Sequence, residues 1–163
     1  MKQNKTGFTL IEIVITIVLV TILAGIAALI ILQGVKAYSD EQSRSDVHYQ
    51  ARLAMERMAR EIRHVRSCAD ITGPVNPSNT LSFTDITGTA VAFSVSGGNL
   101  SRGVDILATG ITSAQPFRFF DRSGNATVSC IAPNDIWFVD ISLTAEQGAE
   151  SLVLNSRVHP RNF

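Results

Sequence analysis

Proline and cysteine are both scarce in this sequence, and each shortage constrains the structure. No proline occurs before Pro74, so none breaks a helix in the N-terminal part of the chain. The two cysteines, Cys68 and Cys130, allow one intramolecular disulfide. At 163 residues, the chain has room for one domain and a long appendage.

Residue patterns that carry catalysis or bind metals are missing as well. The three histidines, His48, His64 and His159, have no cysteine or carboxylate at the spacing of metal ligands. No serine lies in a nucleophile elbow, and Gly97-Gly98 is not followed by the helix that a phosphate-binding loop requires. We therefore expect no enzyme activity, no cofactor and no metal.

One stretch, Asp121-x-Ser123-x-Asn125, faintly resembles the opening of a calcium-binding loop. Ala126 stands where such a loop needs glycine, and Ala132 stands where its closing glutamate belongs. The sequence favours an ordinary polar turn here.

Charge is balanced overall but not along the chain. Through Arg66 there are nine Lys and Arg against six Asp and Glu, a net of +3; from Ser67 onward there are five against eight, a net of −3. Neither part implies nucleic acid or an acidic surface as a direct partner. The division suggests a basic shaft followed by an acidic head.

An apolar run of 25 residues extends from Phe8 to Leu32, with Glu12 as its only ionisable side chain. As a helix this run would be about 38 Å long, enough to cross a bilayer. An unpaired carboxylate costs about 2.5–3.5 kcal/mol at the centre of a membrane helix, so a use for Glu12 is expected. Lys2 and Lys5 precede the run and hold that end on the cytoplasmic side, which exports the rest of the chain.

Two ordinary interpretations of this run are a secretory signal and a plain single-pass anchor. The run is too long for the core of a signal peptide, Glu12 interrupts it, and no small-residue cleavage site with a polar flank follows. A plain anchor explains everything except Glu12 and the Gly7-Phe8 junction.

The residues Gly7-Phe8-Thr9-Leu10-Ile11-Glu12, ahead of an apolar helix, resemble the class III signal of type IV pilins and of type II secretion pseudopilins. The resemblance implies that prepilin peptidase cuts between Gly7 and Phe8 and that the new amine of Phe8 is methylated. It also implies assembly with other pilin or pseudopilin subunits at an inner-membrane platform, where Glu12 pairs with a neighbour's Phe8 amine. Opposite charges attract strongly in a low-dielectric medium, which supports that pairing.

The helix is expected to continue past the membrane, to about Arg66, as an amphipathic helix. Its charged face includes Glu56 and Arg60, whose four-residue spacing adds about 0.2–0.5 kcal/mol. Its apolar face recurs at three- and four-residue steps and consists of Val47, Ala51, Ala54, Met55, Met58, Ile62 and Val65. A sheet must cover this face.

Beyond a loop at residues 73–79, segments rich in branched and aromatic residues alternate with turn residues. Ser96-Gly97-Gly98 predicts a tight hairpin, and residues 121–125 predict another turn. Apolar residues on both faces of 136–143 predict a central strand, whereas 104–107 fits a short strand or a helical turn. The expected strands are 81–84, 90–95, 99–102, 115–121, 126–131, 135–143 and 151–158.

One long helix followed by antiparallel strands is an α+β architecture, and it is also that of pilins. The expected parts are a cleaved leader (1–7), a transmembrane and filament-core helix (8–32), its amphipathic continuation (33–66) and a β-rich periplasmic head (67–163). The chain would be a single-pass protein of the inner membrane, in contact with the lipid bilayer, until it assembles into a pilus or pseudopilus.

With the head exported, Cys68 and Cys130 are expected to pair and to tie the end of the helix to the head. The alternative is two separate reduced thiols. The core of the head is expected to hold five aromatic residues, Phe117, Phe119, Phe120, Trp137 and Phe138.

Softer similarities point to J-type pseudopilins and W-type minor pilins. They lie in residues 51–63, 98–102 and 117–121 and in the terminal Arg161-Asn162. The apolar helix has no proline near Leu29, unlike major pilins, and Cys68 lies too early to staple a C-terminal loop. Both departures favour a minor subunit.

Several functions remain open at this stage. The first is a minor pilin or pseudopilin that forms or primes a filament for secretion, twitching, adhesion or DNA uptake. The second is a periplasmic binding module anchored by an uncleaved helix. The third, an anchored enzyme, is disfavoured because no catalytic constellation is present.

Overall fold

The computed structural model describes residues 9–131 and 135–162. They form one long α-helix followed by antiparallel strands, which confirms the expected α+β class. The chain divides into two compact units, Met1–Gln42 and Ser43–Phe163, and α1 contributes to both. The elements are α1 (Leu10–Ile62), the short 3-10 helix η1 (Cys68–Asp70), β1 (Thr80–Thr84), β2 (Ala90–Ser96), β3 (Asn99–Arg102), β4 (Asp105–Thr109), β5 (Phe117–Phe120), β6 (Phe138–Gln147) and β7 (Glu150–Val158).

In the first unit, the described residues form the apolar part of α1. Every residue from Thr9 to Gln42 is exposed, and leucine, isoleucine and valine side chains point outward on all sides of the helix. A helix that is apolar all round is stable only when lipid or other protein surrounds it. This part of the chain therefore requires a cover that the chain itself does not supply within the unit.

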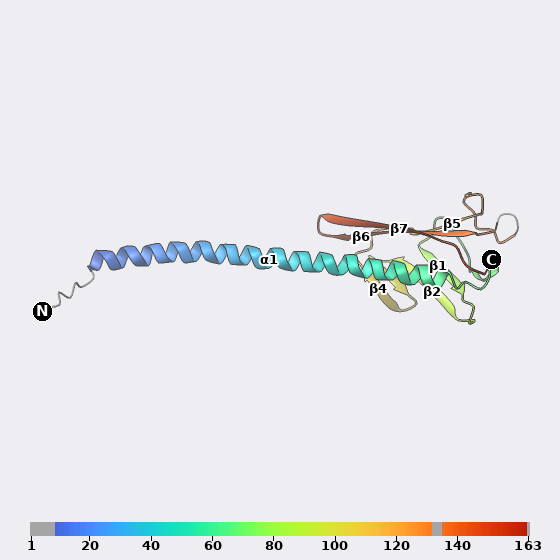
Figure 1. Ribbon diagram of the computed structural model, residues 1–163, viewed down its shortest axis with the longest axis horizontal. Coiled ribbons are helices and arrows are strands. Elements are labelled where there is room, and N and C mark those ends of the chain that lie inside the picture. The colour runs from blue at the N-terminus through green and yellow to red at the C-terminus, as the bar shows by residue number, and fades with distance from the viewer. Residues whose placement is uncertain (1–8, 132–134, 163) are drawn as a thin grey trace. The chain divides into compact units, whose positions relative to one another are not determined.

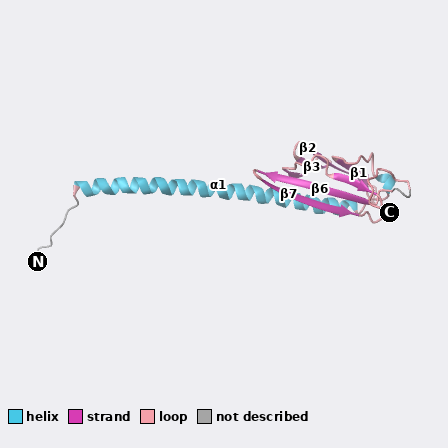
Figure 2. Ribbon diagram, turned by 90° about the horizontal axis from the view of Figure 1, so that it is seen from above, coloured by secondary structure: helices cyan, strands magenta, loops and turns pink. Residues whose placement is uncertain are grey.

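The second unit contains two antiparallel sheets, one with the strand order β1-β2-β3-β4 and one with the order β5-β6-β7. Figure 1 shows β6 and β7 on one side of the C-terminal part of α1, with β2 and β4 on the other side. In the view of Figure 2, β6 and β7 run alongside the same part of the helix. The sequence predicted one covering sheet, and the structure has two.

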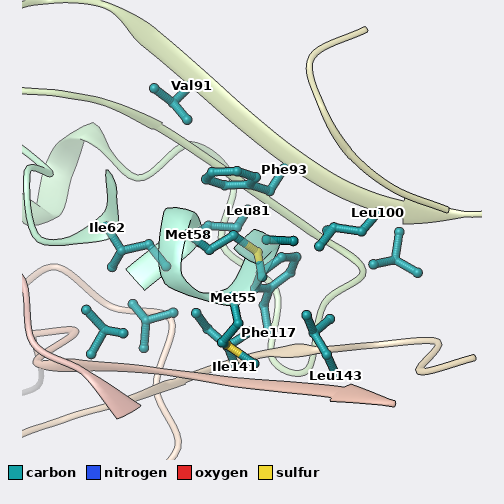
Figure 3. Packing of buried hydrophobic residues seen from close by; sticks show 14 of the residues in the cluster. Met55, Met58, Ile62, Leu81, Val91, Phe93, Leu100, Phe117, Ile141 and Leu143 are labelled. Carbon is teal, nitrogen blue, oxygen red and sulfur yellow. The ribbon is translucent and has the colours of Figure 1, made fainter. Parts of the chain in front are cut away.

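The core of the second unit lies where the two sheets meet the helix. Figure 3 shows Met58 between Phe93 and Leu100 of one sheet and Ile141 of the other. Burying one such side chain contributes about 1.5–3 kcal/mol. All members of the predicted apolar face are buried: Val47, Ala51, Ala54, Met55, Met58, Ile62 and Val65.

The helix ends at Ile62, four residues before the end expected from the sequence. Beyond Ile62 the backbone pairs with the strand β1 and its following turn instead of continuing the helix. Arg66 N donates to Thr84 O at 3.2 Å, and His64 O accepts from Ile86 N at 2.9 Å. These hydrogen bonds to the β1 segment replace the hydrogen bonds of a continued helix, because a buried backbone N–H or C=O needs a hydrogen-bond partner.

The hairpin predicted at Ser96-Gly97-Gly98 joins β2 to β3, with Ser96 opposite Asn99. Gly97 and Gly98 have φ angles of +56° and +78°. Two consecutive positive φ angles match the right-handed twist of a two-residue hairpin and are costly for residues with a side chain. The pair of glycines is therefore required by the turn.

The strand predicted at residues 136–143 is confirmed as central, since β6 lies between β5 and β7. The undecided segment around Val104–Leu107 is a strand, β4. The strand predicted at 126–131 is wrong. There, Ser129 N donates to Thr127 Oγ1 and Ile131 N donates to Ser129 Oγ, so side-chain hydroxyls take up the backbone donors that a strand would need.

A short segment after β4 connects the two sheets. Glu146 N donates to Gly110 O at 2.7 Å, and Thr112 N donates to Thr144 O at 2.9 Å. Gly110 has a φ of +70°, and a Cβ at this position would lie 2.7 Å from Glu146 O. Only glycine allows the two backbones to approach this closely.

Candidate functional site

The apolar part of α1 is the candidate site, because it is the feature that the chain leaves uncovered. Among the described residues, α1 is the one helix long and apolar enough to cross a membrane, as judged by length and composition. Its position near the N-terminus is compatible with a single-pass membrane anchor. The functional question is how its few polar groups are satisfied in an apolar environment.

Two of the three threonines in the apolar run, Thr16 and Thr21, satisfy their hydroxyls within the helix. Thr16 Oγ1 donates to Ile13 O, and Thr21 Oγ1 donates to Val18 O, each at 2.8 Å. A polar group that is satisfied inside its own helix adds little cost in lipid. These two side chains therefore need no partner from another chain.

Glu12 differs from the threonines. It lies in the first turn of α1, three residues after Thr9, and its backbone N–H donates to Thr9 O at 3.1 Å and to Thr9 Oγ1 at 3.4 Å. The Glu12 side chain is exposed, and none of the residues described by the structure binds its carboxylate. The carboxylate is therefore available to a group beyond the described residues.

The pair Thr9 and Glu12 also has the spacing of a capping box, in which a glutamate would bind back to the N-cap backbone N–H. Only the half donated by the Glu12 N–H is present among the described residues. Capping explains the role of the Thr9 hydroxyl, which accepts the Glu12 N–H, but it gives the Glu12 carboxylate no partner among the described residues. The helix dipole stabilises a carboxylate in the first turn, but by only about 0.3–1 kcal/mol.

The predicted cleavage site, Gly7 and Phe8, lies outside the described residues, as does the leader 1–7. The structure therefore gives the position of Glu12. Cleavage between Gly7 and Phe8 and methylation of the Phe8 amine stay predictions.

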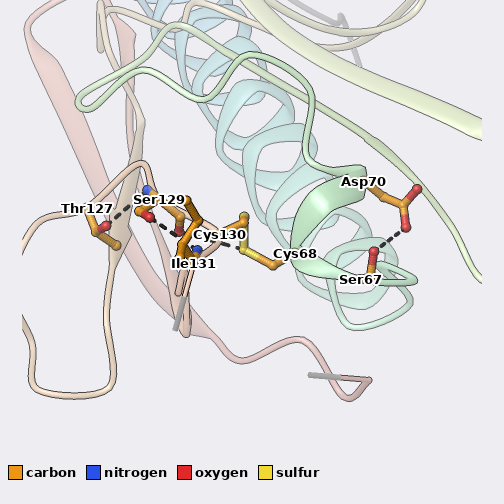
Figure 4. Close-up of a disulfide and its surroundings, with 7 residues drawn as sticks. All are labelled: Ser67, Cys68, Asp70, Thr127, Ser129, Cys130 and Ile131. Carbon is orange, nitrogen blue, oxygen red and sulfur yellow. Dashed lines mark hydrogen bonds between the residues drawn. A yellow bond between two sulfur atoms is a disulfide. The ribbon is translucent and has the colours of Figure 1, made fainter. Parts of the chain in front are cut away.

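The predicted disulfide between Cys68 and Cys130 is confirmed (Figure 4). The two Cα atoms are 5.4 Å apart, and the cysteines are 62 positions apart in the sequence. Cys68 is buried in η1, just after the end of α1, whereas Cys130 lies in the loop between β5 and β6. The bond joins the end of the helix to a segment that has no strand of its own.

The arginine after the helix end is also paired. Arg66 Nε donates to Asp70 Oδ2 at 2.9 Å, and Ser67 Oγ donates to the same carboxylate. The hydrogen bond from Arg66, followed by that from Ser67, lowers the pKa of Asp70 to about 2. The arginines near the helix end thus include at least one that has a structural role.

The segment at Asp121 is a closed polar turn. Asp121 Oδ1 accepts from the backbone N–H groups of Ser123 and Asn125, each at 2.8 Å, and Oδ2 accepts from Asn125 Nδ2 at 3.2 Å. The Asn125 backbone hydrogen bond is the largest cause that lowers the pKa of Asp121. The described residues contain no group of three His, Cys, Asp or Glu that could hold a metal ion.

The aromatic residues divide between the core and the surface. Phe117 and Phe119 are fully buried, as expected, but Phe120, Trp137 and Phe138 are only half-buried. The Trp137 ring stacks on His159 with centroids 4.3 Å apart. Strand alternation places Phe120 and Phe138 on the outer face of the three-stranded sheet, whereas Trp137 precedes β6. Sequence reasoning that treated all the aromatics as core missed this outer face.

In a comparison with known families, residues 2–28 match the model described as the prokaryotic N-terminal methylation motif. No curated protein matches the chain. The match includes Gly7, Phe8 and Glu12 and supports a type IV pilin-like or pseudopilin-like precursor. The family that carries this motif is structural rather than catalytic.

Proposed function

We propose that the protein is a minor pilin or pseudopilin, a structural subunit of a type IV pilus or a type II secretion pseudopilus. The observation that carries the proposal is the apolar part of α1, exposed on all sides and carrying one available carboxylate, that of Glu12. The methylation-motif match over residues 2–28 supports the same class of protein. In this proposal, α1 first spans the inner membrane and then enters the core of a filament.

Processing creates the partner that Glu12 lacks. Prepilin peptidase cuts between Gly7 and Phe8 on the cytoplasmic side, and methylation leaves a cationic secondary amine on Phe8. Pairing the Glu12 carboxylate with this amine on a neighbouring subunit removes two unpaired charges from an apolar environment. Burying either charge alone is costly, so in this proposal a subunit enters the filament only when the Glu12 carboxylate and the Phe8 amine pair.

The minor role has weaker support, which is the resemblance of residues 51–63 to J-type pseudopilins and W-type minor pilins. The apolar part of α1 also has no proline, and Cys68 pairs with Cys130 rather than within a C-terminal loop. In a minor role, the protein would sit beside sibling subunits at or near one end of the filament. Its head, residues 67–163, would be periplasmic or extracellular.

Mass spectrometry of the full chain tests the processing step. The gene is expressed with a prepilin peptidase, and the chain is purified from the membrane in detergent. We expect loss of Met1–Gly7 and the addition of one methyl group. An intact Met1 in the presence of active peptidase would contradict the proposal and leave the anchored binding module as the better hypothesis.

A further inference from the structure

The outer face of the three-stranded sheet carries a row of three charged residues. Arg118 on β5 lies opposite Asp140 on β6, and Asp140 lies opposite Arg157 on β7. Directly opposed residues of antiparallel strands point to the same face, so the three side chains are neighbours. The row contains two positive charges and one negative charge.

One of the two arginines, Arg157, already binds the Asp140 carboxylate. Arg157 Nε and Nη2 donate to the two Asp140 oxygens at 2.6 and 2.7 Å, and the Arg157 guanidinium lies 5.4 Å from the ring centroids of Phe120 and Phe138. A bidentate pair whose guanidinium also lies over two aromatic rings has a defined geometry. Arg157 is therefore committed to a structural pair.

Arg118 is the cation that remains. It is exposed, and no residue described by the structure forms a hydrogen bond or ion pair with its guanidinium. Arg118 lines a hollow of about 440 Å³ on this face, together with Asp140, Ser142, Asn155 and the loop at Ser113. Ser142 and Asn155 lie opposite each other on β6 and β7, so a hydroxyl and an amide adjoin the free guanidinium.

We propose that this hollow, the Arg118 hollow, binds the side-chain carboxylate of an aspartate or glutamate on another protein chain. A planar guanidinium recognises a carboxylate through two parallel hydrogen bonds. The hydroxyl of Ser142 and the amide of Asn155 supply further donors for the carboxylate or for the peptide backbone that carries it.

The charge of the row favours a carboxylate over phosphate. Two arginines and one aspartate leave a single positive charge, which one carboxylate neutralises. A phosphate dianion would exceed this charge, and its second negative charge would be repelled more strongly than a single carboxylate by Asp140.

The lining favours a protein side chain over a small molecule. Pockets for small molecules are mostly apolar and often contain aromatic side chains. None of the described residues that line the Arg118 hollow is aromatic, and most of them carry hydroxyl, amide or charged groups. Such a lining suits a polar contact within a larger interface between proteins.

A titration followed by NMR tests the proposal on the full-length chain in detergent micelles. The probe is N-acetyl-aspartate N-methylamide, and its matched control is N-acetyl-asparagine N-methylamide. We expect the aspartate probe to shift the backbone amide signals of Ser142 and Asn155 and the asparagine probe to leave them in place. Inorganic phosphate is expected to bind more weakly than the aspartate probe.

Two variants distinguish recognition from a general surface effect. Arg118→Gln should weaken binding of the aspartate probe by at least about tenfold. Asp140→Asn releases Arg157 from its partner and should tighten binding by about threefold or more, because a second guanidinium becomes available. Arg63→Gln, at an exposed arginine just after the end of α1, is the control and should leave the affinity unchanged.

The proposal is overturned by equal shifts from the two probes, by unchanged binding in Arg118→Gln, or by unchanged or weaker binding in Asp140→Asn. Tighter binding of phosphate than of the aspartate probe would also overturn it. The test requires neither cleavage after Gly7 nor filament assembly, so its outcome is independent of the proposed function.

Discussion

Arg102 on β3 donates a hydrogen bond from Nε to Glu61 Oε2 on α1, over 2.7 Å. The other oxygen of the same carboxylate accepts from Arg57 Nε at 2.9 Å. The Glu61 side chain is 20% exposed, so the carboxylate is largely shielded from water and each of its oxygens has a donor. This contact fastens the amphipathic part of α1 to the four-stranded sheet.

Removing the donor on the sheet should destabilise the second unit. Arg102→Ala leaves one oxygen of a shielded carboxylate without its charged donor, and we expect the free energy of unfolding to fall by about 1–2 kcal/mol. Thermal unfolding of the full chain in detergent, followed by near-ultraviolet circular dichroism, measures the change. Arg63→Ala, which removes an exposed arginine near the end of α1, is the control and should change stability by less than about 0.5 kcal/mol.

Gly110 should not tolerate a side chain. In Gly110→Ala the new Cβ would lie 2.7 Å from Glu146 O, at a φ of +70°, and we expect a loss of about 2 kcal/mol or more. Gly148→Ala is the matched control, because Gly148 has a φ of +65° and open space around it, so only the strain of about 1–2 kcal/mol applies. Equal losses in urea unfolding of the two variants would contradict the close contact at Gly110.

Removal of the disulfide should destabilise the fold substantially. The bond between Cys68 and Cys130 closes a long loop, and we expect the double variant C68S/C130S to lose about 2–5 kcal/mol. Unfolding midpoints of the parent chain with and without reductant measure the effect. Reductant should have no effect on the double variant; a midpoint that shifts there as well would assign the change to something other than this bond.

Asp70 should contribute to stability in a pH-dependent manner. The hydrogen bonds from Arg66 and Ser67 lower its pKa from 3.8 to about 2. A group whose pKa is lowered on folding contributes fully above its unfolded pKa and loses the contribution as the pH falls through the folded value. The stability difference between the parent and Asp70→Asn should therefore be constant above about pH 5 and shrink between about pH 5 and pH 2.

NMR titration of the Asp70 carboxyl carbon checks this prediction directly. A midpoint near 3.8 would show that the pair with Arg66 does not persist in solution.

Charge at Glu12 should be required for assembly but not for processing. Glu12→Gln keeps the size of the side chain and removes the charge that pairs with the Phe8 amine, so we expect at least a tenfold loss of assembled filament. Loss of the leader and addition of the methyl should be unchanged by mass. Thr16→Val, which alters a hydroxyl satisfied within the helix, should assemble normally.

Filaments sheared from cells and quantified by immunoblotting measure this outcome. If Glu12→Gln assembles as well as the parent chain does, the proposed pairing is wrong even though the methylation motif remains. If Glu12→Gln is not processed, the carboxylate acts at the peptidase instead.

The helical part of the fold followed from the sequence because its signal is local. The spacing of Val47, Ala51 and Met58 marks one face of a helix, and each of these residues is buried. The end of α1 did not follow, because Arg66 binds the backbone of Thr84, which lies in a different element. A contact between residues this far apart cannot be predicted from the pattern of neighbouring residues in the sequence.

The sheets were predicted less completely for the same reason. Individual strands follow from composition, but the division into two sheets depends on which strands pair. The row Arg118, Asp140 and Arg157 exists only through the register of β5, β6 and β7, so sequence reasoning did not find it. Residues 126–131 have a strand-like composition, yet hydroxyls of Thr127 and Ser129 bind their backbone locally.

The bond between Cys68 and Cys130 encloses all of β1 to β5 within one covalent ring. A protease that cuts once anywhere inside that ring, for example at the fully exposed tip around Val104, opens the chain without releasing either piece. The piece that carries α1 stays linked through sulfur to the piece that carries β6 and β7. A head exposed outside the cell would in this way survive a single nick, and it would come apart only after a reductant or a second cut.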